Sequence, residues 1–200
     1  MEARLRLTAS LAALTVACTV HAQTRYVYVD ASAPAGGTGV DWNRAFRDLQ
    51  AAFDSLSTGP AFTEARFYVA QGIYVPTHAF SPLSATTLAG FGIRFCEATG
   101  TCAAPSIRPP TSLSISGSYA GRRSSDPDVQ DFVRTPTILS GDLLGDDTPD
   151  GTHRADNVGP LLTLAGRVPR SDIYGIQFIG GRGLSLRRWP AGWRPVRSRQ

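Results

Sequence analysis

The chain has 200 residues, of which 42% are hydrophobic, and all twenty of its basic residues are arginines, which gives a formal net charge of +4. Two arginines lie before Leu7 and six lie between Arg182 and Arg199, so residues 23–181 carry twelve arginines against fifteen acidic residues. This mildly acidic body excludes a nucleic-acid-binding function, which needs basic side chains gathered over a surface.

Residues 1–22 have the pattern of a secretory signal peptide. Arg4 and Arg6 precede an apolar stretch over 7–18, and small residues frame a cleavage site after Ala22. The stretch is too short and too interrupted for a membrane anchor, which needs about 20 apolar residues. We therefore expect a secreted or extracytoplasmic protein, in the periplasm or at the cell surface, without a transmembrane segment. The alternative is a lipoprotein acylated at Cys18.

Cys96 and Cys102 are the only cysteines after the predicted cleavage site. In an exported protein, an isolated close pair is more often a disulfide than a metal site, because structural zinc takes four Cys or His ligands and this region supplies no His. The sequence predicts a small disulfide loop between them.

One strand and one helix are predicted at the start of the mature chain. Residues 25–30 alternate between two faces, as a strand does. Residues 41–59 then place seven apolar side chains on one helical face, with Asp41 as the N-cap and Gly59 near the end. The seven are Trp42, Ala45, Phe46, Leu49, Ala52, Phe53 and Leu56.

After this helix, apolar β-rich stretches recur at nearly equal intervals along the chain. Their centres are Tyr68, Ile93, Ile115, Ile138 and Leu162. Such spacing is typical of a β-solenoid, in which each turn of chain adds one strand about 4.7–4.9 Å further along an axis. A β-sandwich would place its strands closer together, every ~8–12 residues. A last strand near Ile176 follows after a shorter interval, which requires a shorter final loop.

Several separated motifs keep a common order: "YVYVDASAPAGGTGVDWNRAFRDLQAAFDSL", "RFYVAQGIYVPT", "SISGSYAG", "TPTILSGDLLGDD", "DNVGPLLTLAG" and "DIYGIQFIGGRG". Over roughly 24–183 they resemble the opening portion of secreted right-handed parallel β-helix proteins of the pectate-lyase-like superfamily. The resemblance implies an all-β solenoid with one capping α-helix. The sequence departs from this family in two ways. Residues 76–112, rich in Pro, Ser and Ala, are expected to be an insertion that carries the cysteine loop. Proteins of this family also normally continue through many more coils than these motifs provide.

This organisation predicts four parts. They are the signal peptide 1–22, the strand and capping helix 23–60, the first coils 61–182, and an Arg-rich tail 183–200. The tail abandons strand-like alternation, so we expect it to be disordered and not a native cap. An uncapped end exposes core and backbone groups, and we expect self-association through it.

Asp142, Asp146, Asp147 and Asp150 crowd one loop. Asp side chains accept hydrogen bonds from nearby backbone amides, so the simplest interpretation is a set of turn-forming residues that needs no cofactor. Calcium is the alternative ligand, but Leu144 stands where a third oxygen ligand is expected, and we expect calcium to bind weakly or not at all. Paired carboxylates for glycoside hydrolysis have no support in the spacing.

Two main hypotheses of function follow. The first is an exported β-helix scaffold, or a module that contacts surfaces or glycans, without catalytic activity of its own. The alternative is a polysaccharide lyase or glycosidase of the same superfamily whose catalytic coils lie outside this chain. A third is a remnant that is inactive alone. Polysaccharide or cell-surface components are the expected partners, and the sequence assigns no catalytic residue.

Overall fold

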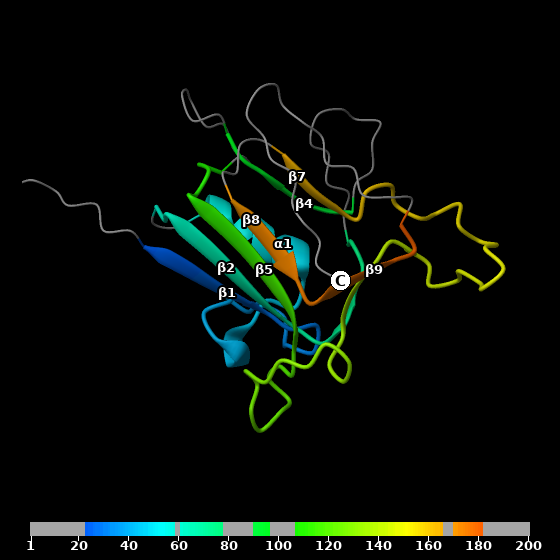
Figure 1. Cartoon of the computed structure of the whole chain (residues 1–200), viewed down its shortest axis with the longest axis horizontal. Coiled ribbons are helices and arrows are strands. Elements are labelled where there is room, and N and C mark those ends of the chain that lie inside the picture. Colours follow the sequence, from blue (N-terminus) through cyan, green and yellow to red (C-terminus); the bar gives the residue numbers. More distant parts are fainter. Residues whose placement is uncertain (1–22, 59–60, 78–89, 97–106, 166–169, 182–200) are drawn as a thin grey trace, which may run out of the picture.

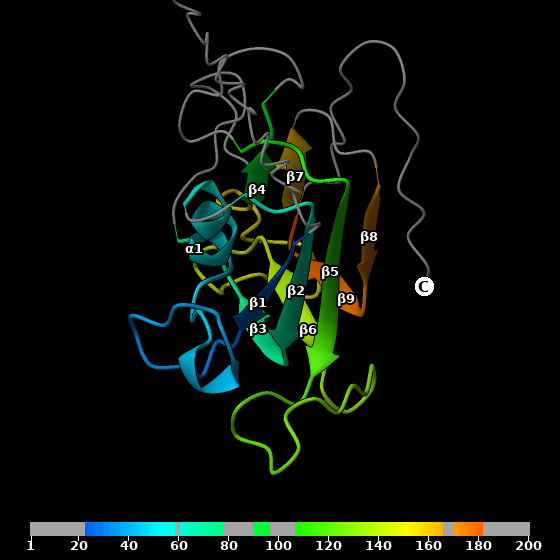
Figure 2. The same cartoon turned by 90° about the vertical axis from the view of Figure 1, so that its left-hand side faces the viewer.

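The strands of this protein form three parallel sheets, which surround one core (Figures 1 and 2). The computed structural model describes residues 23–58, 61–77, 90–96, 107–165 and 170–181. Sheet A has the order β1-β2-β5-β8, sheet B the order β3-β6-β9, and sheet C pairs β4 with β7. The strands are β1 (Thr24–Val29), β2 (Glu64–Ala70), β3 (Gly72–Tyr74), β4 (Phe91–Arg94), β5 (Ser112–Tyr119), β6 (Thr137–Ser140), β7 (Leu162–Ala165), β8 (Ser171–Tyr174) and β9 (Ile176–Ile179).

The chain visits the three sheets in turn, so that each coil stacks on the one before it. The first coil consists of β2, β3 and β4, the second of β5, β6 and β7, and β8 and β9 begin a third. Every strand pair between these coils is parallel, and the one shift of register lies in β2 between Tyr68 and Ala70. This arrangement is consistent with the predicted β-solenoid.

The predicted coil length is wrong, although the five predicted stretches after the helix are all strands. They are β2, β4, β5, β6 and β7, which belong to three different sheets. Ala65 pairs with Leu113, and Leu113 pairs with Ser171, so each coil takes up two or more of the predicted intervals. The regular interval therefore usually leads from a strand in one sheet to a strand in another sheet of the same coil, and only the step from β4 to β5 leads to the next coil.

The core lies between the sheets because alternate side chains of each strand point inward. Phe67, Leu113 and Ile115 from sheet A, Leu139 from sheet B and Ile93 from sheet C are all at most 1% exposed. Burying each such side chain stabilises the fold by about 1.5–3 kcal/mol. β4 lies within the predicted insertion 76–112, yet it contributes its share of this core.

The corners between sheets A and B differ from coil to coil. A single residue joins β2 to β3 (Gln71) and β8 to β9 (Gly175), whereas residues 120–136 form a long loop between β5 and β6. Gly175 adopts a φ of +66°, and a Cβ atom there would lie 2.7 Å from the carbonyl oxygen of Gly117 in the coil below. Only glycine satisfies both the left-handed backbone and this close approach.

The predicted helix over 41–59 is broken into shorter pieces. A 3-10 helix spans Trp42–Arg44, α1 spans Leu49–Asp54, and a second 3-10 helix spans Ser55–Ser57. Asp41 caps only the first piece, and Asp48 caps α1 by accepting a hydrogen bond from the amide of Ala51. Asp48 is therefore the N-cap that the sequence interpretation missed.

Phe46 is the physical reason for this break. Its amide donates to the carbonyl of Tyr28 at 2.9 Å, and its own carbonyl accepts from the amide of Asp30 at 2.8 Å. These bonds pair Phe46 with β1 and require an extended backbone, which a continuous helix cannot provide. The predicted burial of the apolar face is nevertheless confirmed for α1, because Leu49, Ala52 and Phe53 lie in the core.

The side chain of Gln50 in α1 forms hydrogen bonds with the backbone of β4, as a neighbouring strand would. Its side-chain amide donates to the carbonyl of Gly92 at 2.9 Å and accepts from the amide of Gly92 at 2.8 Å. Gln50 is 2% exposed, so both backbone groups of Gly92 are satisfied away from water. The helix thus covers the first strand of sheet C with a polar contact as well as an apolar one.

Three predictions fall outside the described ranges. These are the signal peptide with Cys18, the Arg-rich tail from 183, and Cys102, so the pairing of Cys102 with Cys96 stays a prediction. None of the helices in the described ranges has the length and apolar character that crossing a lipid bilayer requires.

We predict that Gln50→Leu destabilises the protein by about 2–4 kcal/mol, because it leaves a buried N–H and a buried C=O of Gly92 without partners. Gln71→Leu is the matched control, since the exposed Gln71 side chain makes one hydrogen bond, to the carbonyl of Ala120. We expect that change to cost less than about 1 kcal/mol. Chemical denaturation of both variants provides the measurement, and equal losses would contradict the capping role of Gln50.

Candidate binding groove

The outer face of sheet A carries side chains in rows, because the strands that form it are parallel and matched in register. One row contains Tyr26, Arg66, Ser114 and Asp172 on successive strands. The next row contains Tyr28, Tyr68, Ser116 and Tyr174. In both rows the third strand of the sheet, β5, therefore presents a serine between larger neighbours on β2 and β8.

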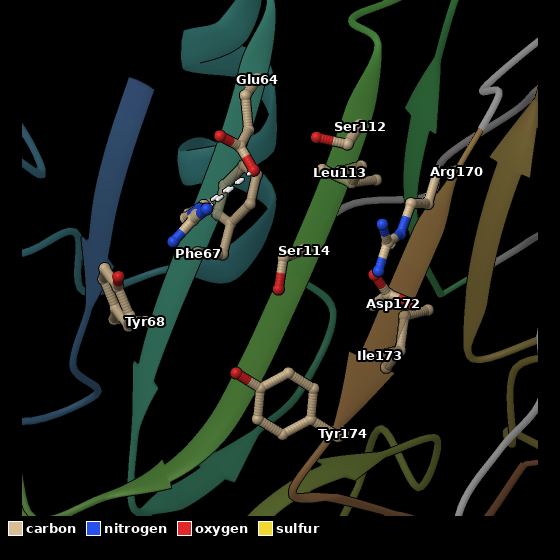
Figure 3. A pocket seen from close by; sticks show the side chains of 11 residues that line it. Glu64, Phe67, Tyr68, Ser112, Leu113, Ser114, Arg170, Asp172, Ile173 and Tyr174 are labelled. Atoms are coloured by element: carbon tan, nitrogen blue, oxygen red, sulfur yellow. Dashed lines mark hydrogen bonds and ion pairs between the residues drawn. The ribbon is translucent and has the colours of Figure 1, made fainter. Parts of the chain in front are cut away.

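A groove of about 630 Å³ results from this contrast in side-chain size (Figure 3). Ser112 and Ser114 form its floor on β5. Glu64, Arg66 and Tyr68 line the β2 side, and Arg170, Asp172 and Tyr174 line the β8 side. Since β2 and β8 are two strand spacings apart, the walls stand about 9–10 Å from each other at the backbone.

Both arginines of the groove are paired with an acid on their own wall. Arg66 Nη2 lies 3.0 Å from Glu64 Oε1, and Arg170 Nε lies 3.1 Å from Asp172 Oδ2. The groove therefore carries two positive and two negative charges.

The pKa of Glu64 reflects this pairing. Desolvation raises it, but hydrogen bonds from Arg66 and from the hydroxyl of Thr24 outweigh that cost and lower the pKa below the ordinary value for glutamate. Glu64 is therefore held in its ionised form.

An aromatic cluster extends the β2 wall toward β1. Tyr68 lies 6.2 Å from Tyr26 in a stacked arrangement and about 5 Å from Tyr28 and Tyr119. The buried Trp42 packs against Tyr28 in an edge-to-face arrangement, with 5.0 Å between the ring centroids. This cluster makes the wall rigid, because each ring except Tyr26 contacts at least two others.

The loop 120–136 closes one end of the groove. Gln130 Nε2 donates to Ser116 Oγ at 2.9 Å and to the carbonyl of Gly117 at 2.7 Å, which leaves Ser116 only 1% exposed. In the same loop, Asp128 accepts a hydrogen bond from Trp42 Nε1 at 2.8 Å. The open part of the groove therefore runs along β5 from Ser112 to the level of Tyr174.

The acidic loop after β6 lies apart from this groove and projects from the sheets (Figure 1). Asp142 accepts hydrogen bonds from the amides of Gly145, Asp146 and Asp147, as the turn-forming interpretation predicts. Asp150 accepts from Thr148 and Thr152, and Asp147 accepts from Asn157.

The candidate calcium ligands do not form one set. Asp142 and Asp146 come together with Asp156, which the sequence interpretation did not include, and their carboxylate oxygens lie within 4.8 Å of one another. Asp147 and Asp150 do not belong to this group. Asp146 also lies beside His153, whose Nδ1 is 3.6 Å from its Oδ2. Asp142, Asp150 and Asp156 accept hydrogen bonds from backbone amides of the loop, as turn-forming residues do.

A comparison with protein-family models, with curated proteins and with solved structures finds no match to this chain. The structure supports the coarser part of the predicted resemblance, namely several parallel sheets accompanied by one short helix.

The sequence interpretation did not identify the groove residues. Alternation in β2 already places Glu64, Arg66 and Tyr68 on the solvent side, and "SLSIS" places the serines of β5 there. The missing information was that these two strands are neighbours, since a whole coil of chain separates their paired positions.

We predict that the acidic loop loses its turn only at low pH. Burial opposes ionisation of Asp142, but hydrogen bonds from the backbone amides of residues 144–147 outweigh it and lower its pKa below the ordinary value of about 3.9. The stabilisation is thus fully present above pH ~4 and is lost as the pH falls through the lower folded-state pKa. In an NMR titration, the Gly145 amide should shift with a midpoint below that ordinary value.

Asp142→Asn is the control for this titration, because it removes the titrating group next to the Gly145 amide. A midpoint above the ordinary value for aspartate, or an unchanged titration in Asp142→Asn, would show that the amides do not stabilise the carboxylate.

Proposed function

We propose that this protein is an exported, non-catalytic module that binds a glycan chain along the outer face of sheet A. The observation that supports the proposal best is the open groove with a serine floor between walls that carry tyrosines and arginines. Sugars combine apolar C–H faces with many hydroxyl groups. Aromatic rings and short polar side chains are therefore the surfaces that suit them.

The dimensions and direction of the groove also fit a chain-like ligand. The groove follows β5, and its two walls leave room for one extended chain above the serines. Its volume lies within the usual range of ligand sites in proteins. A stack of coils suits the binding of a chain-like ligand, because its register aligns the side chains of successive coils along one face.

Binding accounts for the groove better than glycoside hydrolysis does. Glu64 and Asp172 are the carboxylates that line it, and each is paired with an arginine. A general acid in a glycosidase needs a raised pKa so that it stays protonated, whereas the pKa of Glu64 is lowered. The proposal therefore assigns no catalytic residue and requires no cofactor.

We predict that Ser114→Trp weakens binding strongly by filling the groove. Affinity electrophoresis of the protein provides the test, in gels that contain hydroxyethyl cellulose, xylan, mannan or polygalacturonate. At least one polysaccharide should retard the original protein, and Ser114→Trp should weaken that retardation at least tenfold in apparent Kd.

Ser57→Trp is the matched control, because Ser57 is exposed and lies after α1, outside the groove. It should be retarded like the original protein. Circular dichroism of both variants shows whether the sheets are intact. If none of the gels retards the protein, or if both tryptophan variants behave alike, the proposed function is wrong.

A further inference from the structure

We propose that the groove selects a neutral glycan chain, with one sugar ring lying on the face of Tyr174, and discriminates against anionic chains. This inference rests on the proposed function and specifies its ligand. It follows from which groups of the groove are already occupied and which are free.

The charged groups of the groove are paired with one another. Each arginine lies two positions from its acid along the chain, so both pairs form without any ligand. A guanidinium has more N–H donors than its ion pair uses, but an anionic sugar that reached them would meet the repulsion of the neighbouring carboxylate, Glu64 or Asp172.

Two neutral hydroxyls of the groove are free to bond a sugar. Ser112 and Thr24 donate to Glu64, and the hydroxyl of Tyr68 bonds with Arg66. In contrast, the side-chain hydroxyls of Ser114 and Tyr174 have no hydrogen-bond partner within the described ranges. A hydroxyl both donates and accepts, which is the pattern that sugar hydroxyls complement.

Tyr174 also offers the free aromatic face of the groove. Tyr68 on the opposite wall contacts three other rings, but Tyr174 forms no ring pair among the described aromatic residues. It is 41% exposed, and its ring leans from β8 across β5, next to Ser114 (Figure 3). A sugar ring on this face would bring its hydroxyls to Ser114.

These features predict a distinct response to salt and to substitution. Binding to a neutral polysaccharide should change less than about twofold between roughly 50 mM and 500 mM NaCl, because no charge is neutralised. Tyr174→Ala should weaken it about tenfold or more, and Tyr174→Phe, which keeps the ring, should weaken it less.

Affinity electrophoresis of the whole chain tests this with hydroxyethyl cellulose and mannan as neutral probes and polygalacturonate as the anionic probe. Circular dichroism confirms that each variant is folded. The inference is supported if a neutral probe binds more tightly than polygalacturonate and Tyr174→Ala is more damaging than Tyr174→Phe.

The opposite result would be tighter binding to polygalacturonate that weakens with salt and with Arg170→Gln. If Ser114→Trp still blocked this binding, the groove would remain a glycan site and only the preference for a neutral chain would be overturned. If Ser114→Trp blocked binding to none of the probes, the proposed function itself would fail and this inference with it. Equal losses in Tyr174→Ala and Tyr174→Phe would overturn the role of the ring face.

Discussion

The parallel pairing of each coil with the next is the interaction on which the rest of this structure depends. A strand in such a stack leaves a row of backbone groups open wherever it has no neighbour, and a buried open row is costly. The first coil meets this constraint on sheets A and C by different means. β1 pairs with β2, and the side chain of Gln50 pairs with β4. One backbone strand and one side chain thus begin the stack on these two sheets.

The register that pairs the backbone groups of successive coils also determines which side chains lie beside one another on the outer face of sheet A. Because positions are matched from coil to coil, the serines of β5 lie beside Arg66 and Tyr68 on one strand and beside Asp172 and Tyr174 on another. The groove is therefore a consequence of residue size along one strand. A change of a single serine on β5 alters the recess without altering the core behind it, where Leu113 and Ile115 point the other way.

The sequence was informative where a pattern depends on near neighbours. Alternation located the strands, and the apolar spacing over 41–59 identified buried side chains such as Leu49 and Phe53. It failed where distant segments decide the outcome. The pairing of Phe46 with β1 breaks a helix that spacing alone supports, and Asp156 joins Asp142 and Asp146 only because the loop returns. The three-sheet path of each coil was likewise hidden, because equal intervals between strands do not reveal which sheet a strand enters.

The loop at the corner between β5 and β6 has a consequence for how such a protein can vary. Where its neighbours turn within one residue, this coil takes an excursion over residues 120–136 and returns to register at Thr137. The hydroxyl of Thr137 accepts from the amide of Ser118 at 2.7 Å and lies within 3.2 Å of the carbonyls of Val69 and Ala70, which joins both ends of the excursion to the coil below. The strand pairing on either side of this corner does not include residues 120–136. A change in the length or chemistry of that segment would therefore reshape the end of the groove first.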